Sequence, residues 1–146
     1  MGTSTNAYLA FGIDLGKPGD WRIREFTEDG RFTLPWFTGD PDDFAHEALL
    51  HLARERGHDV DFIDDAEEAL DLEALRHRHG DHPMYVLAAR VVRAWRGDVV
   101  AVDFAALERE RAERRWDERL ISACQVLGIT PTQGTPSWVL CSYWSP

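Results

Sequence analysis

The hydrophobic pattern in the first part of the chain predicts a buried strand and a hairpin. Residues 6–15 (NAYLAFGIDL) are apolar at nearly every position, which is typical of a strand covered on both faces. Further on, apolar and polar residues alternate in 21–26 and again in 32–36. Because Asp29-Gly30 lies between these two segments, the alternation predicts a β-hairpin with its turn at that dipeptide.

Three later segments have apolar residues at helical spacing. The first is 40–56, with Asp40 as its candidate N-cap. The second is 66–76. The third is 103–127, which Asp103 can cap and which is followed by a glycine. We therefore expect a helix over each of these ranges.

The segment 84–95 fits two patterns. Its apolar residues recur at helical spacing, but it is rich in valine and leads into a Gly97-Asp98 turn and the apolar run 99–102. β-Branched residues on both sides of such a turn favour a hairpin, which we adopt in preference to a helix. The aromatic-rich segment 136–144 (PSWVLCSYW) predicts a last strand.

The order of these elements predicts an α+β domain, with a mainly antiparallel sheet of about five strands covered by two or three helices. The chain has 146 residues, which suits a single domain over 1–146. A chain of this size can bury a core without disulfides or a structural metal.

Acidic residues outnumber basic ones and leave a net charge of −10. This charge argues against a nucleic-acid or membrane partner, since both need a basic face on the protein. No stretch approaches the roughly 18 apolar residues of a membrane span, and the first residues do not resemble a secretion signal. Cys124 and Cys141 are too few for a disulfide framework, so we expect reduced thiols. Lys17 is the only lysine beside fifteen arginines, which suits the codon bias of a GC-rich genome, and we therefore expect a cytoplasmic protein of a bacterial cell.

The acidic charge is concentrated in one short segment. Residues 1–73 carry 6 basic and 18 acidic side chains, whereas residues 74–146 carry 10 and 8. The segment 59–73 has no Lys or Arg and contains eight candidate partner-binding carboxylates: Asp59, Asp61, Asp64, Asp65, Glu67, Glu68, Asp71 and Glu73. Three interpretations are open: a solvated helix face with a loop before it, a metal site, or a negative surface for a basic partner.

The segment 11–16 (FGIDLG) resembles the first strand of RNase H-like folds, in which an Asp near the strand end reaches a metal ion. A nuclease or phosphohydrolase of this type requires several carboxylates that converge on two metal ions. Its candidate catalytic residues here are Asp14, Asp64 and Asp103. The alternative is a core strand whose Asp14 caps the following turn.

A histidine-rich segment at 77–82 (HRHGDH) resembles the metal-binding signature of the metallo-β-lactamase superfamily. Imidazoles on a tight loop can bind zinc, which makes His77, His79 and His82 weak candidate ligands. That superfamily requires further histidines downstream, and none follows His82. We interpret the segment as a polar loop and expect neither a metal nor a cofactor.

Segments near both ends and in the middle of the chain resemble a group of small uncharacterised proteins of actinobacteria and their phages. They are 4–16 (STNAYLAFGIDLG), 83–89 (PMYVLAA), and 129–133 (ITPTQ) together with 138–144 (WVLCSYW). The resemblance implies no activity, cofactor or site residue. It implies a small acidic protein of a kind that binds a host protein, in some cases by imitating the charge of DNA.

From these observations we expect a non-enzymatic binding domain of phage or prophage type, whose segment 59–73 binds a basic host protein. Carboxylates spaced along a helix and its preceding loop can imitate a row of phosphates, so the protein would act as an inhibitor or DNA mimic. The first alternative is the metal-dependent nuclease built on Asp14. The second is a small-ligand binding domain that uses the aromatic C-terminal strand.

Overall fold

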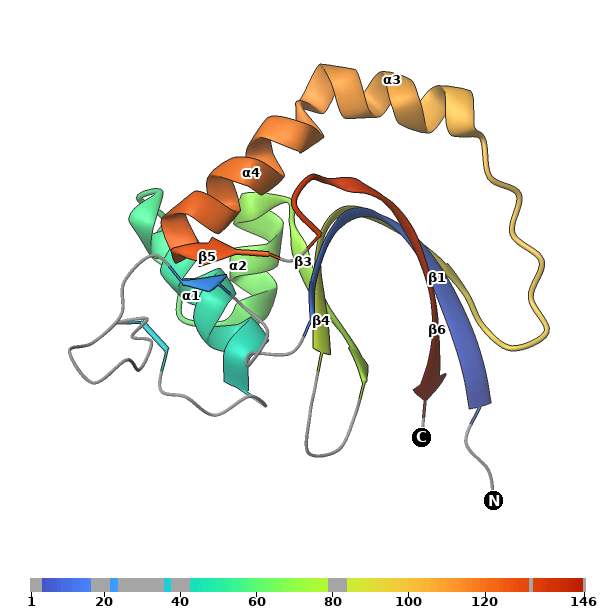
Figure 1. Cartoon of the computed structure of the whole chain (residues 1–146), viewed down its shortest axis with the longest axis horizontal. Coiled ribbons are helices and arrows are strands. Elements are labelled where there is room, and N and C mark those ends of the chain that lie inside the picture. The colour runs from blue at the N-terminus through green and yellow to red at the C-terminus, as the bar shows by residue number, and fades with distance from the viewer. Residues whose placement is uncertain are drawn as a thin grey trace.

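The computed structural model describes residues 4–16, 22–23, 36–37, 43–78, 84–131 and 133–145. In chain order the elements are β1 (Ser4–Gly16), β2 (Arg22–Ile23), α1 (Phe44–Glu55), α2 (Ile63–Leu70), β3 (Glu73–Arg78), β4 (Met84–Ala94), α3 (Phe104–Arg114), α4 (Trp116–Leu127), β5 (Ile129–Thr130) and β6 (Ser137–Ser145). Figure 1 shows a strongly curved sheet with α1, α2 and α4 against its convex face and α3 extending over its crest. The predicted α+β class is confirmed.

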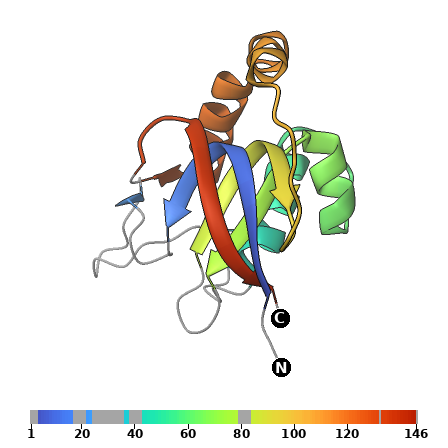
Figure 2. The same ribbon diagram turned by 90° about the vertical axis from the view of Figure 1, so that its right-hand side faces the viewer.

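The main sheet has four antiparallel strands in the order β3-β4-β1-β6, and β2 pairs with β5 in a separate two-stranded sheet. The described part of the chain thus has four strands in its main sheet and four helices, whereas we expected about five strands and two or three helices. β1 lies in the centre of the sheet and pairs with β6 from Ser4 opposite Ser145 to Gly12 opposite Ser137. The first and last elements therefore lie side by side (Figure 2).

β1 is buried on both faces, as its apolar sequence predicts. Phe11, Ile13 and Leu15 join the main core together with the helices. The alternate residues Tyr8 and Ala10 are buried in a smaller cluster on the concave face. No helix of the described ranges covers that face; instead the two edge strands, β3 and β6, come close to each other as the sheet curls. The curvature therefore shields a second core without a further layer.

Gly12 allows β1 and β4 to approach closely at a β-bulge. The pairing register shifts between Phe11 and Gly12, and a Cβ atom at position 12 would lie 2.3 Å from the backbone oxygen of Leu87. This distance leaves no room for a side chain. The glycine of the FGIDLG segment thus has a structural explanation that does not depend on catalysis.

Gln133 completes the outer edge of β1 beyond the point where β6 begins. Its side-chain oxygen accepts a hydrogen bond from the backbone N–H of Asp14 at 2.6 Å, and its amide nitrogen donates to the carbonyl of Gly12 at 3.1 Å. The same nitrogen contacts the carbonyl of Thr135 at 2.7 Å and Ser137 Oγ at 3.2 Å. One amide side chain therefore takes the place of a strand backbone beside β1.

Two predictions in the middle of the chain need correction. The helix expected over 66–76 ends at Leu70, and residues from Glu73 onward form β3. Pairing with β4 decides this segment, against the helical preference of its Ala, Leu and Arg residues. The segment 84–95 forms β4, the strand that we favoured. Its hairpin partner is β3, because 99–102 has no regular structure.

The helix predicted over 103–127 is divided into α3 and α4. The break lies at Arg115, whose backbone is left-handed with φ 55° and ψ 51°. Asp103 is the N-cap of α3 as expected, and its carboxylate accepts a hydrogen bond from the N–H of Ala106 at 3.0 Å. The division changes how the C-terminal helices contact the sheet.

The first helix, α1, begins at Phe44 with Asp43 at its N-cap position, later than we expected. The candidate cap Asp40 lies outside the described residues. Of the hairpin predicted over 21–36, the structure describes only Trp36 and residues 22–23, which form β2 and pair with β5. Within the described ranges, no helix is long and apolar enough to cross a membrane.

Candidate partner-binding surface

The acidic segment 59–73 surrounds α2, on the side of the molecule away from the marked termini (Figure 1). Its eight carboxylates lie on three parts of the fold: Asp59 and Asp61 in the loop before the helix, Asp64, Asp65, Glu67 and Glu68 in α2, Asp71 at its C-cap and Glu73 at the start of β3. The run of charge in the sequence is therefore also a continuous region of the structure.

Three of the eight carboxylates have arginine partners from other elements. The ion pairs are Arg54–Asp61 at 3.6 Å, Arg93–Glu73 at 2.7 Å, and Asp71 with both Arg114 at 3.2 Å and Arg119 at 3.3 Å. Arg119 also donates a hydrogen bond to the carbonyl of Leu70. These contacts tie both ends of the acidic segment to the rest of the protein.

The other five carboxylates have no ion pair within the described part of the chain: Asp59, Asp64, Asp65, Glu67 and Glu68. In α2, Ala66 and Leu70 are buried against the core. Asp64 and Glu68 each lie two residues from Ala66, which places them about 200° around the helix from the buried side. The outer face of α2 is therefore negative, and no ion pair within the described ranges neutralises Asp64 or Glu68.

Phe62, immediately before α2, is a large apolar residue within this negative surface. Its side chain is 69 % exposed, whereas the next residue, Ile63, packs against the main core. Acidic residues precede Phe62 in the loop and follow it in the first turns of α2. Aromatic residues surrounded by polar groups are typical anchors of protein interfaces.

A hollow of about 240 Å³ lies at the end of this surface where α2 meets the sheet. Its lining residues are Glu67, Glu68, Asp71, Leu72, Glu73 and Ala89. Burial raises the pKa of Glu67, and the charges of Glu73 and Asp64 raise it further, while Arg93 acts in the opposite direction. Because this carboxylate is held among like charges, a cationic side chain in the hollow would relieve the repulsion.

The structure places the three candidate nuclease carboxylates on different elements. Asp14 is near the end of β1, Asp64 is in the first turn of α2, and Asp103 caps α3. Across the described ranges, no three His, Cys, Asp or Glu side chains form a group that could hold a metal ion. The three aspartates are therefore not brought together as a two-metal centre requires.

The candidate zinc ligands fall at the edge of the described structure. His77 belongs to β3, but its side chain lies outside the described part, as do His79 and His82. Both cysteines are free thiols, as expected, with Cys124 buried and Cys141 half-buried. Burial raises the pKa of the Cys124 thiol to about 12, so this cysteine is not reactive at neutral pH.

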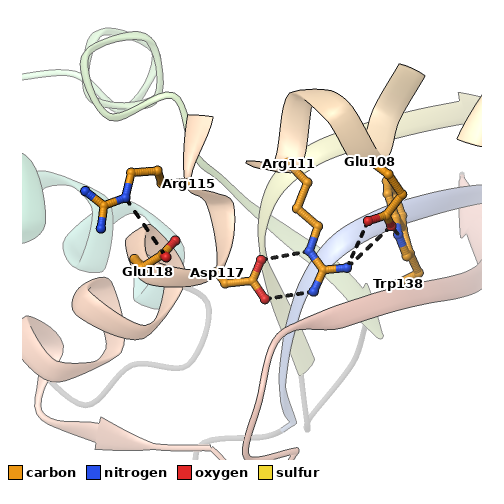
Figure 3. A network of polar contacts seen from close by, with 6 residues as sticks. All are labelled: Glu108, Arg111, Arg115, Asp117, Glu118 and Trp138. Atoms are coloured by element: carbon orange, nitrogen blue, oxygen red, sulfur yellow. Dashed lines mark hydrogen bonds and ion pairs between the residues drawn. The ribbon is translucent and has the colours of Figure 1, made fainter. Parts of the chain in front are cut away.

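The aromatic strand β6 contributes to packing through Trp138. Its ring lies edge-on to Phe11, with 5.3 Å between ring centroids, and it also contacts Phe104 and Trp116. The indole N–H donates to Glu108 at 2.7 Å (Figure 3). One ring of the strand on which the small-ligand alternative depends is thus engaged within the fold.

Two functional or supporting residues escaped the sequence interpretation. Phe62 resembles a core residue beside Ile63, and the only signal of its exposure was its position among four aspartates in 59–65. Gln133 carries no sequence signal, because a polar residue between Pro131 and Gly134 looks like an ordinary loop residue. Its role depends on a contact with a strand more than a hundred positions earlier.

In comparisons with protein-family models, curated proteins and solved structures, the chain matches none. Function therefore has to be inferred from the geometry of the surface around α2.

Proposed function

We propose that this protein is a non-enzymatic binding domain that docks onto a basic protein through the acidic surface around α2. The observation that carries the proposal is the exposed ring of Phe62, which lies in a segment where five of the eight carboxylates form no ion pair within the described structure. A central aromatic anchor supplies affinity, and the surrounding charge supplies orientation and partner choice.

Electrostatics support a basic partner. Five carboxylates that form no ion pair within the described ranges produce a negative potential that acts over about 10 Å at 0.1 M salt. Such a potential attracts an oppositely charged protein and raises its association rate. The hollow beside Glu67 can bind one Arg or Lys side chain of the partner, whose positive charge would interact favourably with the carboxylates that line it.

The partner class that fits this surface is a protein that normally binds nucleic acid. Carboxylates along α2 and its preceding loop present spaced negative charges, as a phosphate backbone does. Phe62 adds an apolar contact that phosphates lack, which favours one partner over basic proteins in general. The resemblance to proteins of actinobacterial phages suggests a host protein as the target, and the free thiols suit a bacterial cytoplasm.

The test is affinity capture from an actinobacterial lysate with the immobilised protein. A basic protein should be retained at about 0.1 M salt and released at about 1 M, where the Debye length falls to about 3 Å. The double variant D64K/E68K should lose the captured protein. The control variant E55K/E113K makes the same change of charge at exposed residues elsewhere and should retain it.

A third variant tests the apolar contact of Phe62 separately from the charge of the surface. F62S leaves the charge unchanged and should weaken capture at least tenfold, because anchor residues contribute about 2 kcal/mol or more to binding. Circular dichroism should remain unchanged, since the ring is mostly exposed. Recovery of no salt-sensitive partner, or equal loss of binding in D64K/E68K and E55K/E113K, would refute the proposal.

A further inference from the structure

The break between α3 and α4 is unusual for its sequence. The residues around it, ERERAERRWDERL, are strong helix formers apart from Trp116 and Asp117, and their pattern predicts one continuous helix. Arg115 nevertheless has a left-handed backbone, which is uncommon for a residue other than glycine. Something outside the local sequence therefore holds the bend.

An ion pair across the break stabilises the bend. Arg111 donates two hydrogen bonds to Asp117, both at 2.8 Å, from Nε to one carboxylate oxygen and from Nη2 to the other (Figure 3). In a continuous helix, positions six apart point about 120° away from each other and lie about 9 Å apart along the axis, so this two-bond contact cannot form there. The contact is specific to the bent arrangement.

The same arginine links the bend to the sheet. Its guanidinium lies 4.4 Å above the ring of Phe11, and it also pairs with Glu108, which accepts the indole N–H of Trp138. Phe104 adds a second contact with Trp138 at 5.9 Å between ring centroids. α3 is therefore attached to β6 and β1 mainly through polar and aromatic side chains.

Apart from these contacts, α3 is attached within the described structure by an exposed ion pair between Arg114 and Asp71 and by a small apolar contact. Leu107 is its one buried residue, and the helix projects over the crest of the sheet (Figure 1). By contrast, α4 buries five residues, including Trp116 and Leu120. A helix with so small an apolar contact can leave the sheet without unfolding the core.

We propose that α3 is a hinged arm that alternates between the bent, docked position and a released position in which α3 and α4 form one continuous helix. In the released form, Arg115 returns to the right-handed helical conformation, and the Arg111–Asp117 contact is broken. α3 then moves away from Trp138 and uncovers the aromatic surface made by Trp138 and Phe11. The hinge thus controls access to a surface distinct from the acidic one around α2.

The test is a distance measurement by electron spin resonance, with nitroxide labels at R109C and S142C in a C141S background. Both labelled positions are exposed, and the buried Cys124 does not react. The labels should report a short distance for the docked arm and a longer one for the released arm. D117A should raise the ratio of long to short distances about tenfold, as expected for loss of a charge-assisted pair.

Two further variants make the result specific. R115G, added to D117A, should restore the short distance, because glycine accepts the left-handed backbone and disfavours a continuous helix. E113A, at an exposed position of α3, should leave the distances unchanged. Helicity measured by circular dichroism should be retained in D117A. A single short distance in D117A, or a long distance accompanied by loss of helicity, would overturn the hinge.

Discussion

Two charged regions of this protein differ in how many of their charges form ion pairs. Segment 108–119 has ten charged side chains among twelve residues, a higher density than the eight among fifteen of segment 59–73. Yet most charges of 108–119 are paired within the described structure: Glu108 and Asp117 with Arg111, Glu110 with Arg114, Glu118 with Arg115, and Arg114 and Arg119 with Asp71. In 59–73, five of eight carboxylates are unpaired.

The comparison indicates that density of charge alone does not identify a binding surface. Paired charges fix the shape of the molecule, and their fields largely cancel a few ångströms away. Unpaired charges of one sign leave a field that a partner can sense. Substitutions in 108–119 should therefore change stability and shape, whereas substitutions in 59–73 should change binding.

The largest loss of stability is expected from a substitution outside both charged regions. Gly12→Ala should destabilise the protein by about 3 kcal/mol, because the new Cβ would collide with the backbone of β4. The midpoint of thermal unfolding should fall by about 10 °C for a chain of this length. At Gly57 an added Cβ atom would have no neighbour within 4 Å, but the backbone is left-handed. Gly57→Ala should therefore lower the free energy of unfolding by only about 1 kcal/mol, the cost of that conformation for alanine. Equal effects of the two substitutions would contradict the tight strand contact.

The largest effect within the charged regions is expected at Arg111. Arg111→Met should lower the free energy of unfolding by about 2 kcal/mol, because it removes the ion pairs of Asp117 and Glu108 and the cation above the ring of Phe11. Binding of the basic partner should be unchanged. Urea unfolding and a titration with the captured protein measure the two quantities. If Arg111→Met weakened binding without lowering the free energy of unfolding, segment 108–119 would serve binding and not stability, contrary to the comparison.

The two regions should respond to pH with opposite signs. The hydrogen bonds from Arg111 hold the pKa of Asp117 below its ordinary value, so this group contributes stability that is lost as pH falls below about 3.9. Burial raises the pKa of Glu67, so protonation of this group stabilises the fold as pH falls toward about 4.3. Glu67→Gln should therefore increase stability at pH 7 by a few tenths of a kcal/mol.

The measurement is the free energy of unfolding of wild type, Glu67→Gln and Asp117→Asn between pH 3 and pH 7. Glu67→Gln should lose its advantage as the pH approaches the ordinary glutamate pKa. Asp117→Asn should be less stable than wild type at pH 7 and should approach it in acid. The same direction of change in both variants would refute the contrast.

The smallest effect on stability is expected at Arg54, whose pair with Asp61 is largely exposed. Arg54→Gln should change the free energy of unfolding by less than about 0.5 kcal/mol. It should also tighten binding of a basic partner about twofold, because it adds a sixth unpaired carboxylate to the surface. Isothermal titration calorimetry of wild type and Arg54→Gln measures the difference in affinity for the partner. Weaker binding by the variant would mean that Asp61 does not contribute to the binding surface.

Much of the sheet could be predicted from the sequence, since apolar residues at nearly every position mark β1 and a high content of valine favours a strand at β4. β3 could not, because residues such as Ala74 and Leu75 prefer a helix in isolation. Their strand conformation depends on pairing with β4, a contact that a local pattern does not contain. The same limit explains the missed break at Arg115, which depends on a side-chain contact across the bend.

For the candidate site, the sequence predicted where the negative charge would gather but not which charges remain free. The pairing of Asp71 and Glu73 depends on arginines of α3, α4 and β4, which the fold brings to the acidic segment. The exposure of Phe62 likewise depends on the direction in which the chain enters α2. Such facts arise from tertiary structure, and the position of Phe62 among aspartates is only a weak sign of its exposure.

The pairing of β1 with β6 has a consequence for synthesis of the chain. Of the described elements, β1 is synthesised before all others, and its neighbour on one side, β6, after all others. One edge of β1 therefore keeps its backbone N–H and C=O groups unpaired with β6 until residues 137–145 have emerged from the ribosome. Contacts between such distant segments form slowly, because the intervening chain must first be brought into a closed loop. The sheet is thus completed after translation of this region, and chaperones that bind extended apolar segments have time to act on β1.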